Sequence, residues 1–269
     1  MTTMTDFDTE CEDVSFSGIT MDTLGRFLAE YSAWLWGSGA TCVRIDKNVS
    51  RIAMTYGYMA DVAVMPRHVT VCLSDEGGNV HTYTQRVVRA GINFDLNTEL
   101  SALSWSIRDG KLSLDDAEKR FRTIVGQPYG NNFNILWLTS LANASFCRLF
   151  GGDAAAMGVV FFATAAGYFL KQRFLREKMD IRVIFFLCAF ISASLASGCG
   201  LFGWGATPGV AVATSVLYLI PGVPYINAAS DMLASHYLCS FSRFADAVIL
   251  TASLSLGLLT SITVMNNCL

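Results

Sequence analysis

The second half of the chain contains apolar stretches long enough to cross a lipid bilayer. Residues 183–204 and 247–265 carry no charged side chain, and a hydrocarbon core about 30 Å thick needs roughly 20 apolar residues in a helix. Lipid offers no partner to unpaired backbone groups, so such stretches span the membrane as helices. Weaker stretches raise the expected number of spans to about five, at residues 133–150, 154–170, 183–204, 208–228 and 244–265.

Charged residues divide the chain near residue 130. Residues 1–132 hold 12 Lys and Arg against 17 Asp and Glu, whereas residues 133–269 hold 7 against 5. Neither part clusters basic residues densely enough to predict a nucleic-acid partner. We expect a disordered acidic segment, a soluble α+β domain and an all-α membrane bundle, over residues 1–20, 21–130 and 131–269 respectively.

Two features predict which side of the membrane the soluble domain occupies. The first 20 residues are acidic and contain no apolar run, so we expect no signal peptide and a cytoplasmic domain. The loop between the second and third expected spans is basic, and basic loops stay on the cytoplasmic side. Counting spans from this loop keeps the soluble domain in the cytoplasm and places the C-terminus outside. The cations of this loop are Lys171, Arg173, Arg176, Lys178 and Arg182.

Hydrophobic periodicity in the soluble part predicts helices and strands in the order α-α-β-β-β-α-α. Asp22 is expected to cap the first helix, and Ser113–Asp116 to form a capping box at the last. The stretch DEGGN at 75–79 is typical of a hairpin turn. The expected elements cover residues 22–37, 41–56, 58–65, 68–74, 80–88, 95–109 and 113–125.

The soluble part contains no sequence motif of a known catalytic class. It has no G-x-S-x-G, P-loop or dinucleotide fingerprint, so we expect an accessory or regulatory domain and no enzyme. The whole chain has eight scattered cysteines without a C-x-x-C pair and only three histidines. These numbers and spacings predict neither a metal site nor a cofactor.

Small residues recur four positions apart in the expected spans. Such faces let helix backbones pack closely in lipid, although membrane helices are rich in small residues in any case. As packing faces they predict a compact bundle and an oligomer. They are Ala154 with Gly158, Ala163 with Gly167, Ser192 with Ala196 and Gly200, and Ser253 with Gly257 and Ser261.

The segment after residue 220 interrupts an apolar run with Pro221, Gly222 and Pro224, and the polar Asn227 and Asp231 follow. A helix broken at membrane depth frees backbone groups, and transporters place substrate and ion sites at such breaks. The alternative is a helix that ends at proline and continues as a polar loop. We favour a substrate or ion pathway.

Arg243 and Asp246 are the other charged side chains after Arg182. They are three positions apart on one expected helix, a spacing at which they can pair. Charged residues retained in membrane segments mark ion or substrate pathways. The alternative is a plain ion pair at the membrane interface, which helix ends tolerate.

Four segments together resemble the threonine/serine exporter family, also known as ThrE-like or YjjP-like. SGATCVRID at Ser38–Asp46 resembles a family motif in the soluble domain, and the segment Arg89–Phe121 resembles the helical pair before the membrane. LFGGD at Leu149–Asp153 resembles the first membrane hairpin. PGVPYINAASDMLASHYLCSFSRFADA at Pro221–Ala247 carries the most specific similarity. The resemblance covers nearly the whole chain after residue 20.

This resemblance implies export of a small hydrophilic metabolite, driven by an ion gradient, across the bacterial inner membrane. It implies a pathway through the polar residues after position 220 and a soluble motif that includes Gly39, Arg44 and Asp46. Thr41 stands where the family usually has Glu, Asp46 and Asp246 replace Glu, and Ser240 stands where Gly is usual. The missing Glu weakens the expectation of a role for the soluble motif.

Longer family members fuse a second membrane region to the C-terminus, whereas this sequence ends at Leu269. It therefore resembles the split form, which works with a separate small membrane protein. The resemblance associates the split form with dicarboxylate export, such as succinate, and the fused form with threonine and serine. We expect one subunit of such an exporter. The alternatives are a membrane-anchored enzyme or sensor that acts through its soluble domain, and a purely structural subunit.

Overall fold

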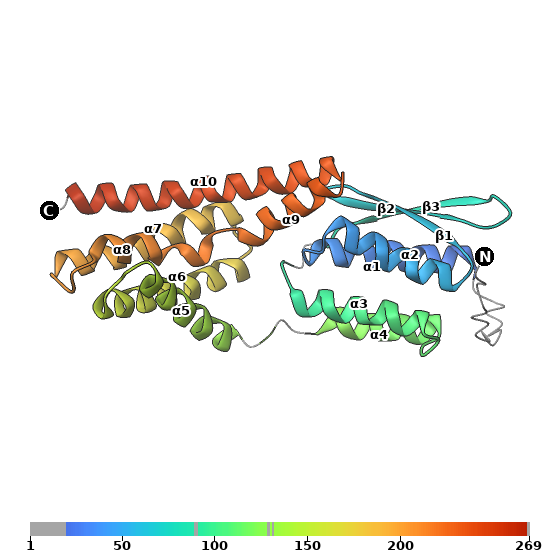
Figure 1. Cartoon of the computed structure of the whole chain (residues 1–269), viewed down its shortest axis with the longest axis horizontal. Coiled ribbons are helices and arrows are strands. Elements are labelled where there is room, and N and C mark those ends of the chain that lie inside the picture. Colours follow the sequence, from blue (N-terminus) through green and yellow to red (C-terminus); the bar gives the residue numbers. More distant parts are fainter. Residues whose placement is uncertain (1–19, 89–90, 128–129, 131, 268–269) are drawn as a thin grey trace, which may run out of the picture. The chain divides into compact units, whose positions relative to one another are not determined.

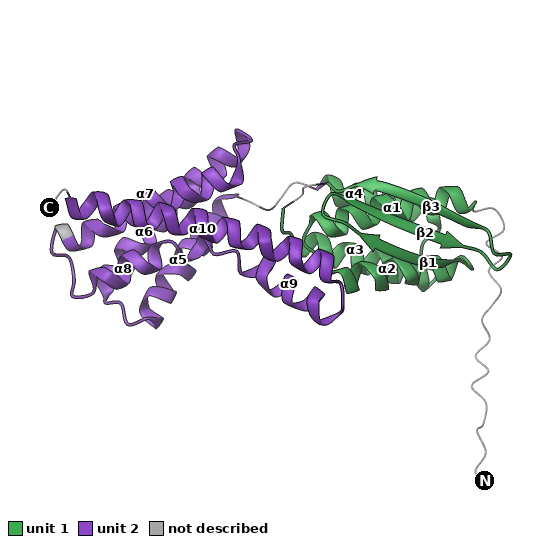
Figure 2. Cartoon of the chain, turned by 90° about the horizontal axis from the view of Figure 1, so that it is seen from above, with its two compact units in different colours: residues 1–126 green, residues 127–269 purple. Residues whose placement is uncertain are grey.

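The computed structural model describes residues 20–88, 91–127, 130 and 132–267. The chain forms two compact units, which divide between Gly126 and Gln127 (Figure 2). Each unit is described by itself below. The disorder expected for residues 1–20 lies outside the described residues except at Thr20.

Unit 1, the N-terminal unit, has the expected order of two helices, three strands and two helices. The hydrophobic periodicity located each element to within about two residues of its observed bounds. The elements are α1 (Met21–Gly37), α2 (Cys42–Thr55), β1 (Met59–Val64), β2 (His68–Ser74), β3 (Val80–Arg86), α3 (Phe94–Arg108) and α4 (Leu114–Gly126).

The three strands form one antiparallel sheet in the order β1-β2-β3. The expected hairpin is confirmed: His68 pairs with Arg86 and Ser74 with Val80 across β2 and β3. Alternate β2 residues are buried, because one face of the sheet packs on helices and the other faces solvent. The buried ones are Val69, Val71 and Leu73.

Helix α1 is the middle layer of unit 1. Figure 1 shows the sheet on one side of α1 and α2, and α3 with α4 on the other. A helix covered on two sides needs apolar residues around most of its circumference, and α1 has them. The Tyr31 hydroxyl crosses to α3 and donates to the Leu100 carbonyl over 2.8 Å. The Phe27 and Phe121 rings meet edge to face, with centroids 5.6 Å apart.

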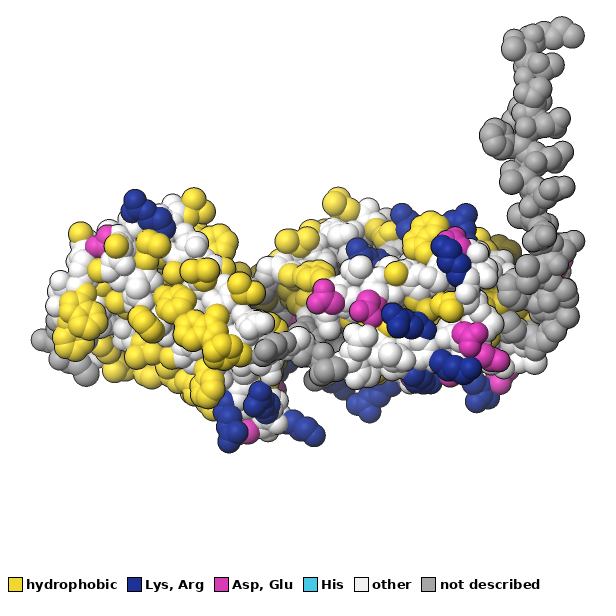
Figure 3. Space-filling model, turned by 90° about the horizontal axis from the view of Figure 1, so that it is seen from below, with side chains coloured by type: hydrophobic (Ala, Val, Ile, Leu, Met, Phe, Trp, Pro, Cys, Tyr) yellow, Lys and Arg dark blue, Asp and Glu magenta, His cyan; other side chains and the backbone are white. Residues whose placement is uncertain are grey.

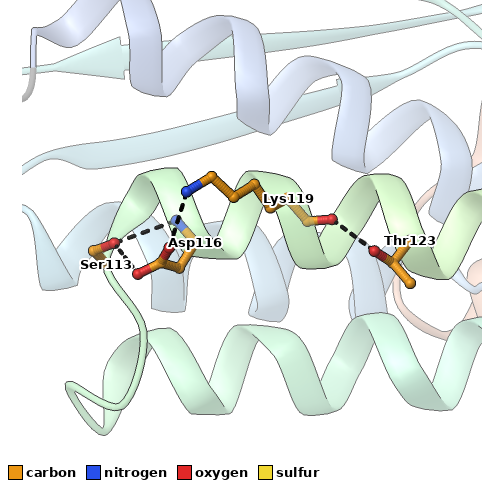
Figure 4. A network of polar contacts seen from close by, with 4 residues as sticks. All are labelled: Ser113, Asp116, Lys119 and Thr123. Carbon is orange, nitrogen blue, oxygen red and sulfur yellow. Dashed lines mark hydrogen bonds and ion pairs between the residues drawn. The ribbon is translucent and has the colours of Figure 1, made fainter.

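The helix caps follow local hydrogen bonding. The N-cap of α1 is Thr20, whose hydroxyl accepts from the Thr23 N–H, so the expectation that Asp22 caps this helix is wrong. Asp22 lies instead in the first turn, where a carboxylate suits the helix dipole. At α4 the expected cap is confirmed: the Ser113 hydroxyl accepts from the Asp116 N–H and donates to the Asp116 carboxylate (Figure 4).

All the secondary-structure elements of unit 2, within its described residues, are helices. Its short α8 and single-turn η1 precede a break in the chain, and the last helix is the longest. The elements are α5 (Asn132–Leu149), α6 (Ala154–Arg176), α7 (Ile181–Leu201), α8 (Pro208–Ser215), η1 (Leu217–Leu219), α9 (Gly222–Leu233) and α10 (Tyr237–Asn267).

Three helices of the described part are long and apolar enough to cross a membrane, namely α6, α7 and α10. The pair formed by α8–η1 and α9 adds a fourth candidate if the bent pair is one span. Length and composition thus identify three or four candidates among the described helices, and the number of about five stays a prediction. Helix α5, expected as the first span, is not among the candidates, since its apolar run is interrupted by Asn134 and Asn143 and ends at Arg148.

On the face drawn in Figure 3, hydrophobic side chains cover much of unit 2, whereas most of the charged side chains lie on unit 1. Phe162 of α6 is 70% exposed and Phe241 of α10 is 71% exposed. A surface that exposes many large aromatic residues is typical of a protein surrounded by lipid. The apolar helices and this surface together indicate a membrane-embedded protein.

Close backbone contacts hold α7 and α10 together. A Cβ atom added to Gly257 of α10 would overlap the carbonyl oxygen of Phe186 in α7. The Ser194 and Ser261 hydroxyls join the same two helices at 2.9 Å. The packing interpretation of this small-residue face is confirmed. It does not extend to Gly158, whose Cβ position meets nothing within 4 Å.

Candidate functional site

The break expected after residue 220 is present, and Pro221 causes it. The helical segment that ends at Leu219 and the helix α9 that begins at Gly222 differ in direction by 58°. Ile220 is extended (φ −60°, ψ 125°), because the ring of a following proline disfavours helical backbone. Pro224 lies in the first turn of α9, where a missing N–H costs nothing. Pro221 and not Pro224 therefore ends the first segment.

A tight turn then folds α9 back along α10 (Figure 1). Ser235 adopts φ +65°, the left-handed region, and the His236 N–H donates to the Asp231 carbonyl over 2.8 Å. The fully buried Ser240 donates its hydroxyl to the Ala228 carbonyl over 2.7 Å. A small residue is required at position 240, since the two helices approach closely there. We call α9, this turn and the first turns of α10 the hairpin, residues 222–247.

The hairpin brings Asp231 and Arg243 together. Asp231 Oδ2 and Arg243 Nη1 lie 3.4 Å apart, with the two side chains 0% and 12% exposed. The expected pairing of Arg243 with Asp246 is wrong. The ion pair of Arg243 reaches across the hairpin to α9, and Asp246 is an exposed residue of α10. Helical spacing suggested the nearer partner, but the turn at Ser235 supplies the actual one.

Because the Asp231–Arg243 pair is buried, separating its two charges costs a large free energy. Moving either charge alone from water into a membrane interior costs several kcal/mol, and removing one partner of a buried pair typically costs about 3–5 kcal/mol. Charged pairs in membrane segments typically occur where a protein transports an ion or binds a charged ligand. Asn227, half-buried, precedes Asp231 by four residues and so lies on the same face of α9.

Further polar contacts, which the sequence pattern did not predict, surround the segment before the break. Asn143 of α5 donates to the Thr164 hydroxyl over 2.6 Å and to the Thr214 carbonyl of α8 over 3.0 Å. The Ser192 hydroxyl of α7 lies 3.0 Å from the Tyr218 hydroxyl of η1. In the sequence, Asn143 stands out only as an interruption of an apolar run. The amide of Asn143 within an apolar helix could have predicted this cluster, because a buried amide needs polar partners.

The soluble motif lies in unit 1. Gly39 has φ +91° in the turn between α1 and α2, a conformation that side chains other than glycine rarely adopt. Arg44 and Asp46 are exposed residues of α2. Thr41, at the position where the family usually has Glu, is the N-cap of α2 and accepts from the Arg44 N–H.

Within the described residues, no group of three His, Cys, Asp or Glu side chains is arranged to hold a metal ion. The described cysteines are all free thiols, and five of these six are buried. The five buried thiols pack as small apolar side chains.

The chain is similar to known transport proteins. The ThrE family profile, described as “Putative threonine/serine exporter”, matches residues 26–265. A relative from Klebsiella aerogenes named “Probable succinate transporter subunit YjjP” is 27% identical over 242 residues, which cover 88% of this chain and 92% of the relative. Its namesake from Escherichia coli K12 is 27% identical over 243 residues, covering 89% and 93%. No solved structure matches the chain significantly.

The profile match takes in both units, from α1 almost to the end of α10. It includes the soluble motif, the break at Pro221 and the hairpin with Asp231 and Arg243. The match agrees with the resemblance seen in the four sequence segments, and similarity to transporters favours a non-enzymatic role. The chain belongs to the ThrE family.

Proposed function

We propose that this chain is one subunit of a two-component exporter that moves a small dicarboxylate, such as succinate, out of the cytoplasm. The observation that carries the proposal is the buried Asp231–Arg243 pair beside a broken helix. The names of the two relatives support the substrate class. Amino acids such as threonine and serine are the competing substrates, and the experiment below includes them.

The pair offers a simple way to couple export to a proton gradient. Paired with Asp231, the Arg243 guanidinium is neutralised. Protonation of Asp231 removes that negative partner, and Arg243 then meets a substrate carboxylate through two parallel hydrogen bonds. Because Arg243 is available to the substrate only when Asp231 carries the proton, proton and substrate bind together at the pair. The proton gradient therefore acts on substrate binding at this point.

The remaining polar groups complete the pathway. The break at Pro221 and Gly222 leaves backbone groups without helical partners, and these can bind substrate oxygens. Asn227 offers an amide on the face of α9 that carries Asp231. Asp246 is exposed on α10, and we assign it to the part of the pathway that the second component completes.

The second component is a separate small membrane protein, equivalent to the C-terminal half of fused family members. Both relatives are named as subunits, which supports a partner for this chain as well. The assembly resides in the bacterial inner membrane with unit 1 in the cytoplasm and the C-terminus outside. The basic segment from Lys171 to Arg182 supports this orientation.

Efflux from proteoliposomes tests the proposal. The full chain is reconstituted with its co-purifying small membrane protein, the vesicles are loaded with labelled succinate, threonine or serine, and a pH gradient is imposed. We expect succinate efflux that falls at least tenfold in Asp231→Asn and in Arg243→Ala. Glu177→Gln is the matched control, since Glu177 forms an exposed ion pair with Arg173.

A double variant separates transport from folding. Asp231→Asn with Arg243→Gln removes both charges at once, which avoids leaving one charge buried without its partner. We expect this variant to fold and assemble but not to transport. Wild-type efflux in both single variants would refute the site, and efflux of threonine but not succinate would refute the substrate class. Turnover of a metabolite by the full chain would instead favour the enzyme alternative.

A further inference from the structure

An open groove in unit 1 collects cations that the transport proposal does not use. It has a volume of about 490 Å³ and runs between α2 and α3. Arg44, Lys47 and Arg51 line it from α2, and Thr98 and Ser101 line it from α3. Pockets for small molecules typically measure about 300–1,000 Å³, so the groove has room for a metabolite.

Helix geometry concentrates positive charge on this side of α2. Residues 44, 47 and 51 share one face, because positions three, four and seven apart lie one above another. Like charges at such spacings repel. The acidic residues of the two helices, Asp46, Asp95 and Glu99, are not among the lining residues.

Several cations outside the groove are paired within unit 1: Arg26, Lys111, Lys119 and Arg122 each pair with a carboxylate. Among the described residues, no carboxylate lies within ion-pair distance of the three groove cations. An external anion would relieve the repulsion that the protein itself leaves in place.

Arg51 is held in a fixed position. Its Nη1 donates to Asn48 Oδ1 over 2.8 Å and to Ser104 Oγ over 2.6 Å. The guanidinium stacks over the Trp105 ring, 3.9 Å from its centroid. An arginine whose plane is fixed loses little freedom when an oxyanion binds. Arg44 and Lys47, in contrast, are exposed and can close over a ligand.

We propose that this groove binds a small anion with at least two oxyanion groups, either carboxylates or phosphates. Positions 44 and 51 are separated by two helical turns, about 10 Å along the axis, so one oxyanion group cannot meet all three cations. Arg44 and Lys47 bind one end of the ligand and Arg51 the other. The inference concerns unit 1 alone and stands whether or not the hairpin transports.

Calorimetric titration of the full chain in uncharged detergent tests the inference, with succinate and pyrophosphate as the two probes. The background variant Asp231→Asn with Arg243→Gln removes the proposed transport site without leaving a buried charge unpaired, so any remaining binding reports on the groove. Succinate binding would identify a carboxylate ligand, and pyrophosphate binding a phosphate ligand. Either outcome supports the inference, whereas binding of neither probe overturns it.

Charge substitutions assign any binding to the groove. We expect Arg44→Gln and Lys47→Gln each to weaken binding about tenfold, while Lys119→Gln, an exposed cation of α4, leaves it unchanged. Thr41→Asp keeps a good N-cap but places a carboxylate beside Arg44, so we expect it to abolish binding. Thr20→Asp makes the same change at the N-cap of α1 and should have no effect. Equal affinity in the groove variants and their controls would overturn the inference.

Discussion

Ser235 sets the geometry of the hairpin through its backbone. Its φ of +65° costs a residue with a side chain about 1–2 kcal/mol, and glycine almost nothing. We expect Ser235→Gly to raise the unfolding temperature in detergent and the β-branched Ser235→Val to lower it. Lys178, with φ +56° between α6 and α7, is a matched site at which the glycine variant should behave alike. Equal unfolding temperatures for the glycine and valine variants would show that the left-handed turn is not required.

Asp153 links stability to pH at the loop before α8. Its carboxylate accepts from the Ala156 N–H over 2.8 Å and from the Ala206 N–H over 2.6 Å. These backbone hydrogen bonds, Ala156 first, lower the pKa of Asp153 below its ordinary value of 3.8. Because the folded-state pKa lies below the unfolded-state value, the stabilisation is complete above pH of about 4 and is lost as pH falls through the folded-state pKa.

The neutral variant Asp153→Asn mimics the protonated carboxyl. We expect its unfolding temperature to lie below that of the wild type by a constant amount between about pH 5 and 8, and the difference to shrink below about pH 4. Unfolding followed by circular dichroism across this range measures the difference. A gap that stays constant down to pH 2.5 would show that the Asp153 charge does not contribute.

Residue chemistry made part of the candidate site predictable. Pro221, Asp231 and Arg243 stand out because prolines and charges are costly in apolar segments. Their arrangement was not predictable, since Ser235, which makes the turn, carries none of the usual signals of glycine or proline. Without that turn, helical spacing favoured Asp246 as the partner of Arg243 over the observed Asp231.

At the scale of the elements, the crossing of α7 and α10 depends on Gly257. Any side chain there would overlap the Phe186 carbonyl, and backbone cannot swing aside as a side chain can. We expect Gly257→Ala to destabilise the fold by about 1–3 kcal/mol. Gly158→Ala is the control, because open space surrounds that Cβ and alanine favours helix. Chemical unfolding in mixed micelles compares the two variants, and a loss of stability in Gly158→Ala but not in Gly257→Ala would contradict the packing.

The limits of the membrane helices were less predictable than those of unit 1. Helix α6 continues past the expected residue 170 to Arg176, because Lys and Arg suit the last turns of a helix. Helix α10 begins at Tyr237 and not near 244, since Asp231 neutralises Arg243 and lets the helix include it. Hydropathy reports where a chain meets lipid, whereas helix ends depend on caps and partners elsewhere in the fold.

At the scale of the whole molecule, the core of unit 1 predicts independent folding. Tyr31, Leu100 and Phe121 are fully buried within this unit. We expect residues 20–127 expressed alone to be soluble and to unfold in one cooperative transition, as small domains with their own core do. Size-exclusion chromatography and thermal circular dichroism check this. Aggregation of the fragment together with a molten near-ultraviolet spectrum would show that the core depends on the rest of the chain.

The bent pair of α8–η1 and α9 is either one broken span that crosses the membrane or a re-entrant loop that returns to the same side. The proposed export mechanism requires the broken span. A crossing span puts Trp204 and Tyr237 on opposite sides, whereas a re-entrant loop puts them on one side. Both side chains are exposed. Cysteines introduced at these positions, in a chain whose native cysteines are replaced, can be labelled in intact cells with an impermeant maleimide.

The positive-inside rule places Lys178 in the cytoplasm, so it serves as the internal reference. We expect Trp204→Cys to label from outside, and Lys178→Cys and Tyr237→Cys to label only after the membrane is permeabilised. Labelling of Tyr237→Cys together with Trp204→Cys would make the pair a re-entrant loop and reverse the side on which α10 begins. Asp231 and Arg243 would then open toward the outside, and the hairpin could not be the cytoplasmic entry for a substrate to be exported.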